Sequence, residues 1–282
     1  YLHLSPAMQR DLPASLDAVL EQEGVALPDG IALSSAPMPV AEGEPIAKDV
    51  AIVINVSIDL AQNPEARSLT HEEWLGLLLD RETTLRRQKR YETRARAARL
   101  RQQACIEDID FCAERGLDRT LVMALASCDY IRRHNNVLIT GPCGVGKSWL
   151  ACALGERACR EDFSVAYHRM PRLLAVLALA RGDGRHARLL KTLGRVDLLI
   201  LDDWGPEQLD ADQRRDILEI VEDRHGRRST VVTSQAPVEA WYDLVGNPTV
   251  ADAVLDRLVH NAHRITLTGE SLRKRSRQTL AA

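Results

Sequence analysis

The sequence contains few aromatic side chains. They make up 4% of its 282 residues, and only two are phenylalanine. Proteins that hold single-stranded nucleic acid stack the bases on aromatic rings, so this composition argues against such a platform. The chain also lacks any run of the ~20 apolar residues that a membrane-spanning helix needs. No basic stretch followed by an apolar one, the pattern of a signal peptide, is visible near the start, so we expect a cytoplasmic protein.

Paired cysteines are absent as well. Six cysteines are present, and none stands in a C-x-x-C pair, the spacing of many zinc sites and redox motifs. One of the six, Cys143, lies inside a glycine-rich loop. We therefore expect free thiols in a reducing compartment.

Charged residues are unevenly distributed along the chain. Residues 1–66 carry two basic and ten acidic side chains, whereas residues 67–282 carry 35 basic and 30 acidic ones. A mildly basic body can bind a polyanion where its positive charges are clustered. The chain is expected to comprise an acidic, partly disordered extension without an assigned role (1–66), a helical basic region (67–130), an α/β domain (131–270) and a basic tail (271–282).

A long basic helix is predicted ahead of the α/β domain. Thr70 and Glu73 form the T-x-x-E pattern of a helix start, and no glycine or proline interrupts residues 82–104. From residue 81 to residue 101 there are nine basic side chains and only two acidic ones. Few Asn or Gln residues accompany them, so we expect contacts with DNA phosphates without base readout; a solvated helix face is the alternative. The expected DNA contacts are Arg86, Arg87, Lys89, Arg90 and Arg94.

Strand and helix patterns alternate from residue 137 onward. Apolar runs typical of buried strands lie at 137–140, 164–168, 197–201, 230–233 and 264–267. Helical patterns lie between these runs, and Asp210 with Gln213 predicts the capped start of one of them. This alternation predicts an α/β fold, a parallel sheet flanked by helices on both faces. Because only about a dozen residues follow the last run in this sequence, we expect no full C-terminal helical lid.

A glycine-rich loop follows the first of these runs. Residues 141–148 match G-x-x-x-x-G-K-[ST] at every fixed position, with a strand before and a helix after. Backbone N–H groups of such a loop bind phosphate oxygens, and the helix adds its positive end. We expect Lys147 to reach the β- and γ-phosphates of ATP and Ser148 to give its hydroxyl to Mg²⁺. The expected nucleotide contacts are Gly141, Pro142, Cys143, Gly144, Val145, Gly146, Lys147, Ser148 and Trp149.

The third apolar run ends in two adjacent acids, Asp202 and Asp203. In P-loop NTPases such a strand supplies an acid for the metal and can supply one that orients the attacking water. We expect Asp202 to serve the metal and Asp203 to act as the general base. One strand-and-helix unit separates the loop from this strand, which favours an ATPase with water as the nucleophile. Gln235, after the fourth run, would lie beside the γ-phosphate if that strand sits between the other two.

These motifs and their flanking segments resemble the IstB-type helper ATPases of insertion-sequence transposition, AAA+ proteins related to DnaC-type helicase loaders. The resemblance covers residues 68–275, and the matching segments are GPCGVGKSWLACAL, RVDLLILDDWG, RRSTVVTSQAPVEAW and NPTVADAVLDRLVHNAHRITLTGESLRK. It implies an AAA+ ATPase at 131–270 that forms oligomers on duplex DNA, with active sites between subunits and a transposase as partner.

The resemblance also implies roles for three residues. Gln235 matches the sensor position that orients the lytic water, Arg257 matches the arginine finger that reaches a neighbouring subunit's ATP, and Arg273 matches a second sensor arginine. The sequence departs from the family pattern in two places. Residues 1–66 do not match the family's N-terminal end, and Asp203 stands where many AAA+ proteins have the longer glutamate, which predicts slow turnover.

Other functions fit the same motifs. A replicative helicase loader would use the same chemistry with a different partner. A P-loop kinase would transfer phosphate to a small-molecule acceptor and be indifferent to DNA. An ATP switch would bind the nucleotide without turning it over. The segment DRLVHNAHRI favours the transposition reading among these.

Overall fold

The computed structural model describes residues 70–111, 115–205 and 207–272. Its contacts divide the chain between Lys89 and Arg90 into two units, each of which is described by itself. The expectations for residues 1–66, for Arg273 and for the basic tail beyond Leu272 lie outside the described residues. None of the described helices combines the length and the apolarity needed to cross a membrane.

The predicted basic helix is α4, His71–Ala98. Its predicted start is confirmed, because the Thr70 N–H donates to the Glu73 carboxylate at 2.9 Å and the Glu73 N–H donates to the Thr70 hydroxyl at 3.4 Å. The helix ends earlier than the uninterrupted pattern suggested. Arg99 takes a left-handed φ of 51°, which breaks the helix although no glycine or proline is present.

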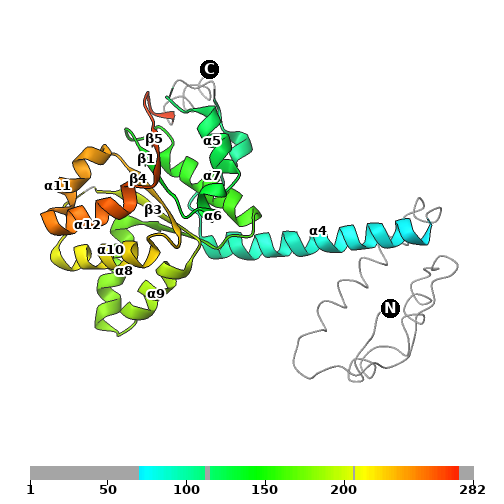
Figure 1. The fold of residues 1–282 in the computed structure, drawn as a ribbon, viewed down its shortest axis with the longest axis horizontal. Helices are drawn as coiled ribbons and strands as arrows, with labels where there is room; N and C mark the ends of the chain where they lie inside the picture. Colours follow the sequence, from blue (N-terminus) through cyan, green and yellow to red (C-terminus); the bar gives the residue numbers. More distant parts are fainter. Residues whose placement is uncertain (1–69, 112–114, 206, 273–282) are drawn as a thin grey trace, which may run out of the picture. The chain divides into compact units, whose positions relative to one another are not determined.

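Five parallel strands form the sheet, in the order β2-β3-β4-β1-β5. Figure 1 labels β3, β4, β1 and β5 in the middle of the molecule's α/β part. The strands are β1 Asn136–Thr140, β2 Val165–Arg169, β3 Leu198–Trp204, β4 Ser229–Ser234 and β5 Ala262–Thr266. Each lies within a few residues of its predicted run. Strand β4 lies between β1 and β3, which is the condition that places the end of β4 beside the glycine-rich loop.

Helices cover both faces of the sheet. The described elements around it are η2 Ile106–Asp108, α5 Arg119–Ala126, α6 Asp129–Arg132, α7 Lys147–Arg160, α8 Met170–Gly182, α9 His186–Arg195, α10 Ala211–Arg224, η3 Val238–Ala240, α11 Trp241–Val245 and α12 Pro248–Val259. The capping box predicted from Asp210 and Gln213 opens α10.

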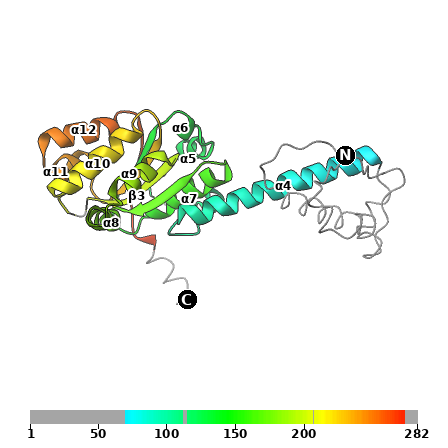
Figure 2. The ribbon, with the colours of Figure 1, turned by 90° about the horizontal axis from the view of Figure 1, so that it is seen from below.

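Alternate residues of the strands belong to two separate apolar cores. Ile139 and Ile200 pack with α5 and α7 on one face, whereas Leu138, Leu199 and Val232 pack with α8, α10 and α12 on the other. Helices α10 and α12 lie side by side on the second face in both views (Figure 2). Strands buried on both sides explain why the runs are continuously apolar.

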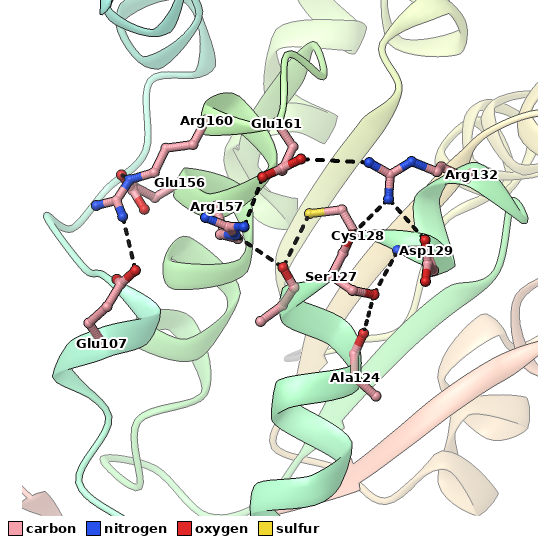
Figure 3. Close-up of polar contacts among 11 residues, drawn as sticks. Glu107, Ala124, Ser127, Cys128, Asp129, Arg132, Glu156, Arg157, Arg160 and Glu161 are labelled. Carbon is pink, nitrogen blue, oxygen red and sulfur yellow. Dashed lines mark hydrogen bonds and ion pairs between the residues drawn. The ribbon is translucent and has the colours of Figure 1, made fainter.

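The segment before β1 belongs to the first core. Its buried side chains include Ala98, Ile106 and Val122, all in the cluster that contains β1 and α7. Polar contacts also tie it to α7: the Arg157 guanidinium donates to the Ala126 carbonyl at 3.0 Å, and Arg160 pairs with Glu107 at 3.0 Å (Figure 3). These contacts all lie within the unit that begins at Arg90.

Glycine at position 155 lets the segment after α4 pack against α7. A Cβ at Gly155 would lie 2.8 Å from Ile200 Cδ1 and 3.0 Å from Leu100 Cδ2. We predict that Gly155→Val lowers the free energy of unfolding by about 1–3 kcal/mol because it overpacks this contact. Denaturant titration of the full chain measures the change.

Gly182→Ala is the matched control, since Gly182 ends α8 and nothing lies within 4 Å of the Cβ it would gain. This variant should be neutral or more stable by about 0.4–1 kcal/mol. Equal midpoints for Gly155→Val and the wild type would contradict the packing described here.

Candidate nucleotide-binding site

The glycine-rich loop joins β1 to α7 in a conformation that requires glycine. Gly141, Gly144 and Gly146 have φ values of 145°, 88° and 100°. A Cβ at Gly141 would lie 2.1 Å from the Leu267 carbonyl oxygen, and one at Gly144 would lie 2.1 Å from the Ser271 hydroxyl. The loop is therefore closely packed against the chain that follows β5. These φ values turn the backbone in ways that L side chains rarely adopt, as the motif predicted.

Lys147 begins α7 at the mouth of this loop. Its Nζ donates to the carbonyl oxygens of Gly141 and Pro142, both at 2.7 Å. Burial lowers the pKa of Lys147, and the nearby Cys143, Asp202 and Asp203 act in the opposite direction. The ammonium is thus held over the loop, where phosphate oxygens would meet it.

Asp202 is a buried carboxylate that accepts hydrogen bonds from three hydroxyl groups. Its side chain is 1% exposed. Oδ1 accepts from Ser148 and from Thr233, each at 2.6 Å, and Oδ2 accepts from Tyr167 at 2.5 Å. Burial and Asp202 together raise the pKa of Tyr167, so this phenol stays a donor. Sequence reasoning placed Ser148 beside Asp202 and missed Thr233 and Tyr167.

Asp203 lines the same cleft as Asp202, at the C-terminal end of β3, because the strand is irregular at this point. Adjacent residues of a regular strand point to opposite faces. At Asp203 φ is 68°, and the pairing with β4 shifts between Leu201 and Trp204, as in a β-bulge. The Asp203 carboxylate pairs with Arg169 at 2.7 Å and lies 3.5 Å from Gln235 Nε2.

These elements enclose one cleft of about 410 Å³. The residues that line it are Arg101, Gln102, Cys143, Gly144, Gly146, Lys147, Ser148, Trp149, Arg169, Asp202, Asp203, Thr233, Gln235 and Leu272. The structure therefore brings the loop, both acids and Gln235 together. Among the expected nucleotide contacts, the Val145 side chain is buried in the core beneath the loop, so only its backbone can serve a ligand. Gly141 and Pro142 do not line the cleft.

The oxygen atoms of Ser148 and Asp202 suit a magnesium ion. The Ser148 hydroxyl oxygen and the nearer Asp202 oxygen are 2.6 Å apart, close enough to bind one cation together. Hydroxyl and carboxylate oxygens are hard ligands of the kind that Mg²⁺ takes, alongside water and substrate phosphates. The cleft thus offers both halves of a magnesium-nucleotide site, the loop for phosphates and these oxygens for the metal.

The expected arginine finger lies away from this cleft. Arg257 pairs with Glu222 at 3.0 Å and donates to the Ala253 carbonyl at 2.7 Å. Its own carbonyl accepts from the side chain of Asn136, the first residue of β1, at 3.0 Å. The loop follows the last residue of β1, whereas Arg257 contacts the first. Arg257 therefore lies near the N-terminal ends of the strands, and the cleft of its own subunit lies at their C-terminal ends.

Three of the five basic residues expected on DNA, Arg86, Arg90 and Arg94, form ion pairs within the chain. Arg90 and Arg94 both pair with Asp162, at 3.2 and 2.8 Å. Arg86 pairs with Glu82 at 2.5 Å. Arg87 and Lys89 are exposed. Asp162 is 68 residues or more away in sequence, so the composition of the helix gave no sign of this pairing.

Comparisons with known proteins agree on one group. The family model described as "IstB-like ATP binding protein" matches residues 50–280. A Sinorhizobium fredii protein named "Putative insertion sequence ATP-binding protein y4pL" is 62% identical over 220 residues, which are 78% of this chain and 90% of that protein. The Pseudomonas aeruginosa "Insertion sequence IS21 putative ATP-binding protein" is 32% identical over 219 residues, 78% of this chain and 83% of that protein.

Solved structures share the fold. The crystal structure of DnaI superposes with a TM-score of 0.52 at 20% identity, over 59% of this chain and 92% of that one. The replication initiator DnaA bound to AMPPCP and single-stranded DNA gives a TM-score of 0.51 at 16% identity, over 65% of this chain and 56% of that one. The predicted α/β fold, a parallel sheet flanked by helices, is thereby confirmed.

Cys143 provides a chemical test of the cleft. Its thiol is exposed, whereas Cys128, Cys152 and Cys159 are buried. Burial raises the pKa of Cys128 to about 11 and that of Cys159 to about 12, so both thiols stay protonated and unreactive near neutral pH. We predict that N-ethylmaleimide modifies Cys143 and blocks nucleotide binding, and that magnesium-ATP protects it.

Cys143→Ser serves as the control. It should bind nucleotide and keep that binding after the reagent, which separates Cys143 from every other cysteine of the chain. Peptide mass spectrometry and a nucleotide-binding titration measure the two effects. Complete modification of Cys143 with undiminished nucleotide binding would show that the loop does not hold the nucleotide.

Proposed function

Since the chain belongs to the IstB-like ATP-binding protein family, as its motifs indicated, we propose that it is a magnesium-dependent ATPase that assembles on duplex DNA and assists a transposase. The observation that carries this proposal is the cleft in which the glycine-rich loop, the buried Asp202 and the more exposed Asp203 meet. The transposase partner is proposed from relatives named after insertion sequences. The cytoplasm is the proposed location, where both DNA and ATP are available.

The residues of the cleft divide the work of hydrolysis. The loop and Lys147 would bind the phosphates, and Ser148 and Asp202 would hold Mg²⁺, which neutralises charge on the β- and γ-phosphates. Asp203 would accept a proton from the attacking water, and Gln235, 3.5 Å from that carboxylate, would orient the water. Arg169 holds Asp203 through two hydrogen bonds, from Nε at 3.1 Å and Nη2 at 2.7 Å, and so sets the position of the base.

The place of Arg257 supports a site shared between subunits. It lies near the N-terminal ends of the strands, and the cleft lies at their C-terminal ends. Arg257 would therefore act on a neighbour's ATP rather than on that of its own subunit. The ion pair with Glu222 would keep the side chain oriented until a neighbour docks. An arginine finger supplied in this way is worth about 10³–10⁵ in rate.

Helix α4 is the proposed DNA contact. Exposed cations such as Arg87 and Lys89 would pair with DNA phosphates, without reading base sequence. Asp162 competes for Arg90 and Arg94, so these two would contribute less than their charge suggests. Binding of this kind should weaken steeply with salt, because each neutralised phosphate releases counterions.

Phosphate release from ATP tests the proposal, measured over a range of protein concentration with and without duplex DNA. We expect a rate that rises with DNA and more steeply than linearly with protein, because the active site is shared. Arg257→Ala should lower the rate by about 10³-fold or more, while the monomer still binds ATP. Arg215→Ala is the control, an exposed arginine of α10 that should leave the rate unchanged.

A mixture of two inactive variants separates action in trans from damage to the fold. Lys147→Ala loses its own phosphate contact but still offers Arg257 to a neighbour. Mixed with Arg257→Ala, it should restore part of the activity that neither variant has alone. A rate indifferent to DNA, linear in protein and unaffected by Arg257→Ala would overturn the shared site and point to a small-molecule acceptor.

A further inference from the structure

Arg101 lies in the nucleotide cleft although it belongs to the segment that follows the basic helix. Its side chain is 51% exposed and lines the cleft together with the loop and Asp203. Its Nη1 lies 4.0 Å from Oδ2 of the buried Asp202, and its guanidinium also reaches the Tyr167 hydroxyl. An arginine from outside the phosphate motif therefore stands beside the proposed metal site.

The backbone that carries Arg101 is anchored on α7. Leu100 packs on Gly155, where a Cβ would lie 3.0 Å from Leu100 Cδ2. The backbone N–H groups of Arg101 and Gln102 face the thiol of Cys152, which belongs to α7, the helix that begins at Lys147. The backbone is thus fixed by α7 itself, while the guanidinium projects into the cleft.

The two arginines of the cleft differ in their partners. Arg169 donates two hydrogen bonds to Asp203 and is committed to that carboxylate. Within the described part of the chain, the polar partners of Arg101 are Asp202, through a long 4.0 Å ion pair, and Tyr167, whereas a guanidinium carries five N–H donors. Arg101 therefore retains donors for a further anion in the cleft.

We propose that Arg101 binds the γ-phosphate of ATP held in the same subunit and so distinguishes ATP from ADP. The inference rests on the ATP binding proposed above. Ser148 and Asp202 would hold the metal, and Asp203 and Gln235, which line the cleft with Arg101, would hold the attacking water next to the γ-phosphate, so a guanidinium in this part of the cleft would meet the γ end of the triphosphate. With Mg²⁺ bound, Asp202 would share its negative charge with the metal, and the Arg101 guanidinium would donate to the phosphate instead of pairing with Asp202.

The same contact links the nucleotide to the end of α4. Residues near that end are tied to α7 and the turn after it: Tyr91 donates to Glu156 at 2.8 Å, and Arg94 pairs with Asp162 at 2.8 Å. Arg101 follows Ala98, the last helical residue, by three positions. A contact between Arg101 and the γ-phosphate would therefore act on the segment that directly follows the proposed DNA-binding helix. Any effect of ATP on the affinity for DNA would be matched by an equal effect of DNA on the affinity for ATP.

Calorimetric titration of the full chain with AMPPNP and with ADP, each with Mg²⁺, tests the inference. We expect Arg101→Ala to lower the affinity for AMPPNP roughly tenfold, the scale of a lost charge-assisted hydrogen bond, and to leave the affinity for ADP nearly unchanged. Arg101→Lys should recover part of the difference. Arg99→Ala is the matched control, because Arg99 is an exposed arginine of the same segment that does not line the cleft.

Each outcome is informative. Unchanged ADP binding by Arg101→Ala shows that the variant is folded, and a selective loss of AMPPNP affinity supports the γ-phosphate contact. An affinity ratio of AMPPNP to ADP that stays at the wild-type value in Arg101→Ala, or the same selective loss of AMPPNP affinity in Arg99→Ala, would overturn it. A wild-type chain that binds neither nucleotide would instead refute the proposed function on which the inference rests.

Discussion

The carboxylate of Asp202 is held inside the protein by hydroxyl groups from three different elements. Ser148 comes from α7, Tyr167 from β2 and Thr233 from β4, and each donates to it within 2.6 Å. An ionised carboxylate buried without such partners would be strongly destabilising. The three elements are therefore fixed around β3, and β2 and β4 are its two neighbours in the sheet. Because Ser148 directly follows Lys147, the same network also sets the start of α7 and the mouth of the phosphate loop.

The irregular end of β3 completes this arrangement. A regular strand would direct the Asp203 side chain to the face opposite that of Asp202. The bulge turns Asp203 toward Arg169 and Gln235, which lie at the ends of β2 and β4. Its N–H donates to the Thr233 hydroxyl at 3.0 Å, while that hydroxyl donates to Asp202. One buried threonine thus fixes both acids at once.

Local patterns in the sequence were sufficient to predict much of this. The loop motif, the apolar runs, the two acids and both helix starts depend on neighbours within a few residues, and the structure has them where they were expected. Gln235 could be placed only on the condition that β4 lies between β1 and β3, and that condition is met.

The remaining features depend on contacts between distant segments. Tyr167 and Thr233 are ordinary strand residues until the strand order brings them to β3. Asp162, in the turn after α7, offsets part of the positive charge of the basic helix through its ion pairs with Arg90 and Arg94. A count of the charges along one helix cannot reveal such pairs. Arg101 was counted among the helix cations, yet Arg99 ends the helix and directs the chain to the cleft.

The position of the bound metal tests the role of Asp202 most directly. Crystals of the protein with a non-hydrolysable ATP analogue and Mn²⁺ in place of Mg²⁺ would show the ion by its anomalous scattering. We expect a single peak beside Ser148 and Asp202, with the triphosphate on the N–H groups of the loop and one of its oxygens on the ion. A peak elsewhere, or a triphosphate that leaves the loop empty, would contradict this expectation.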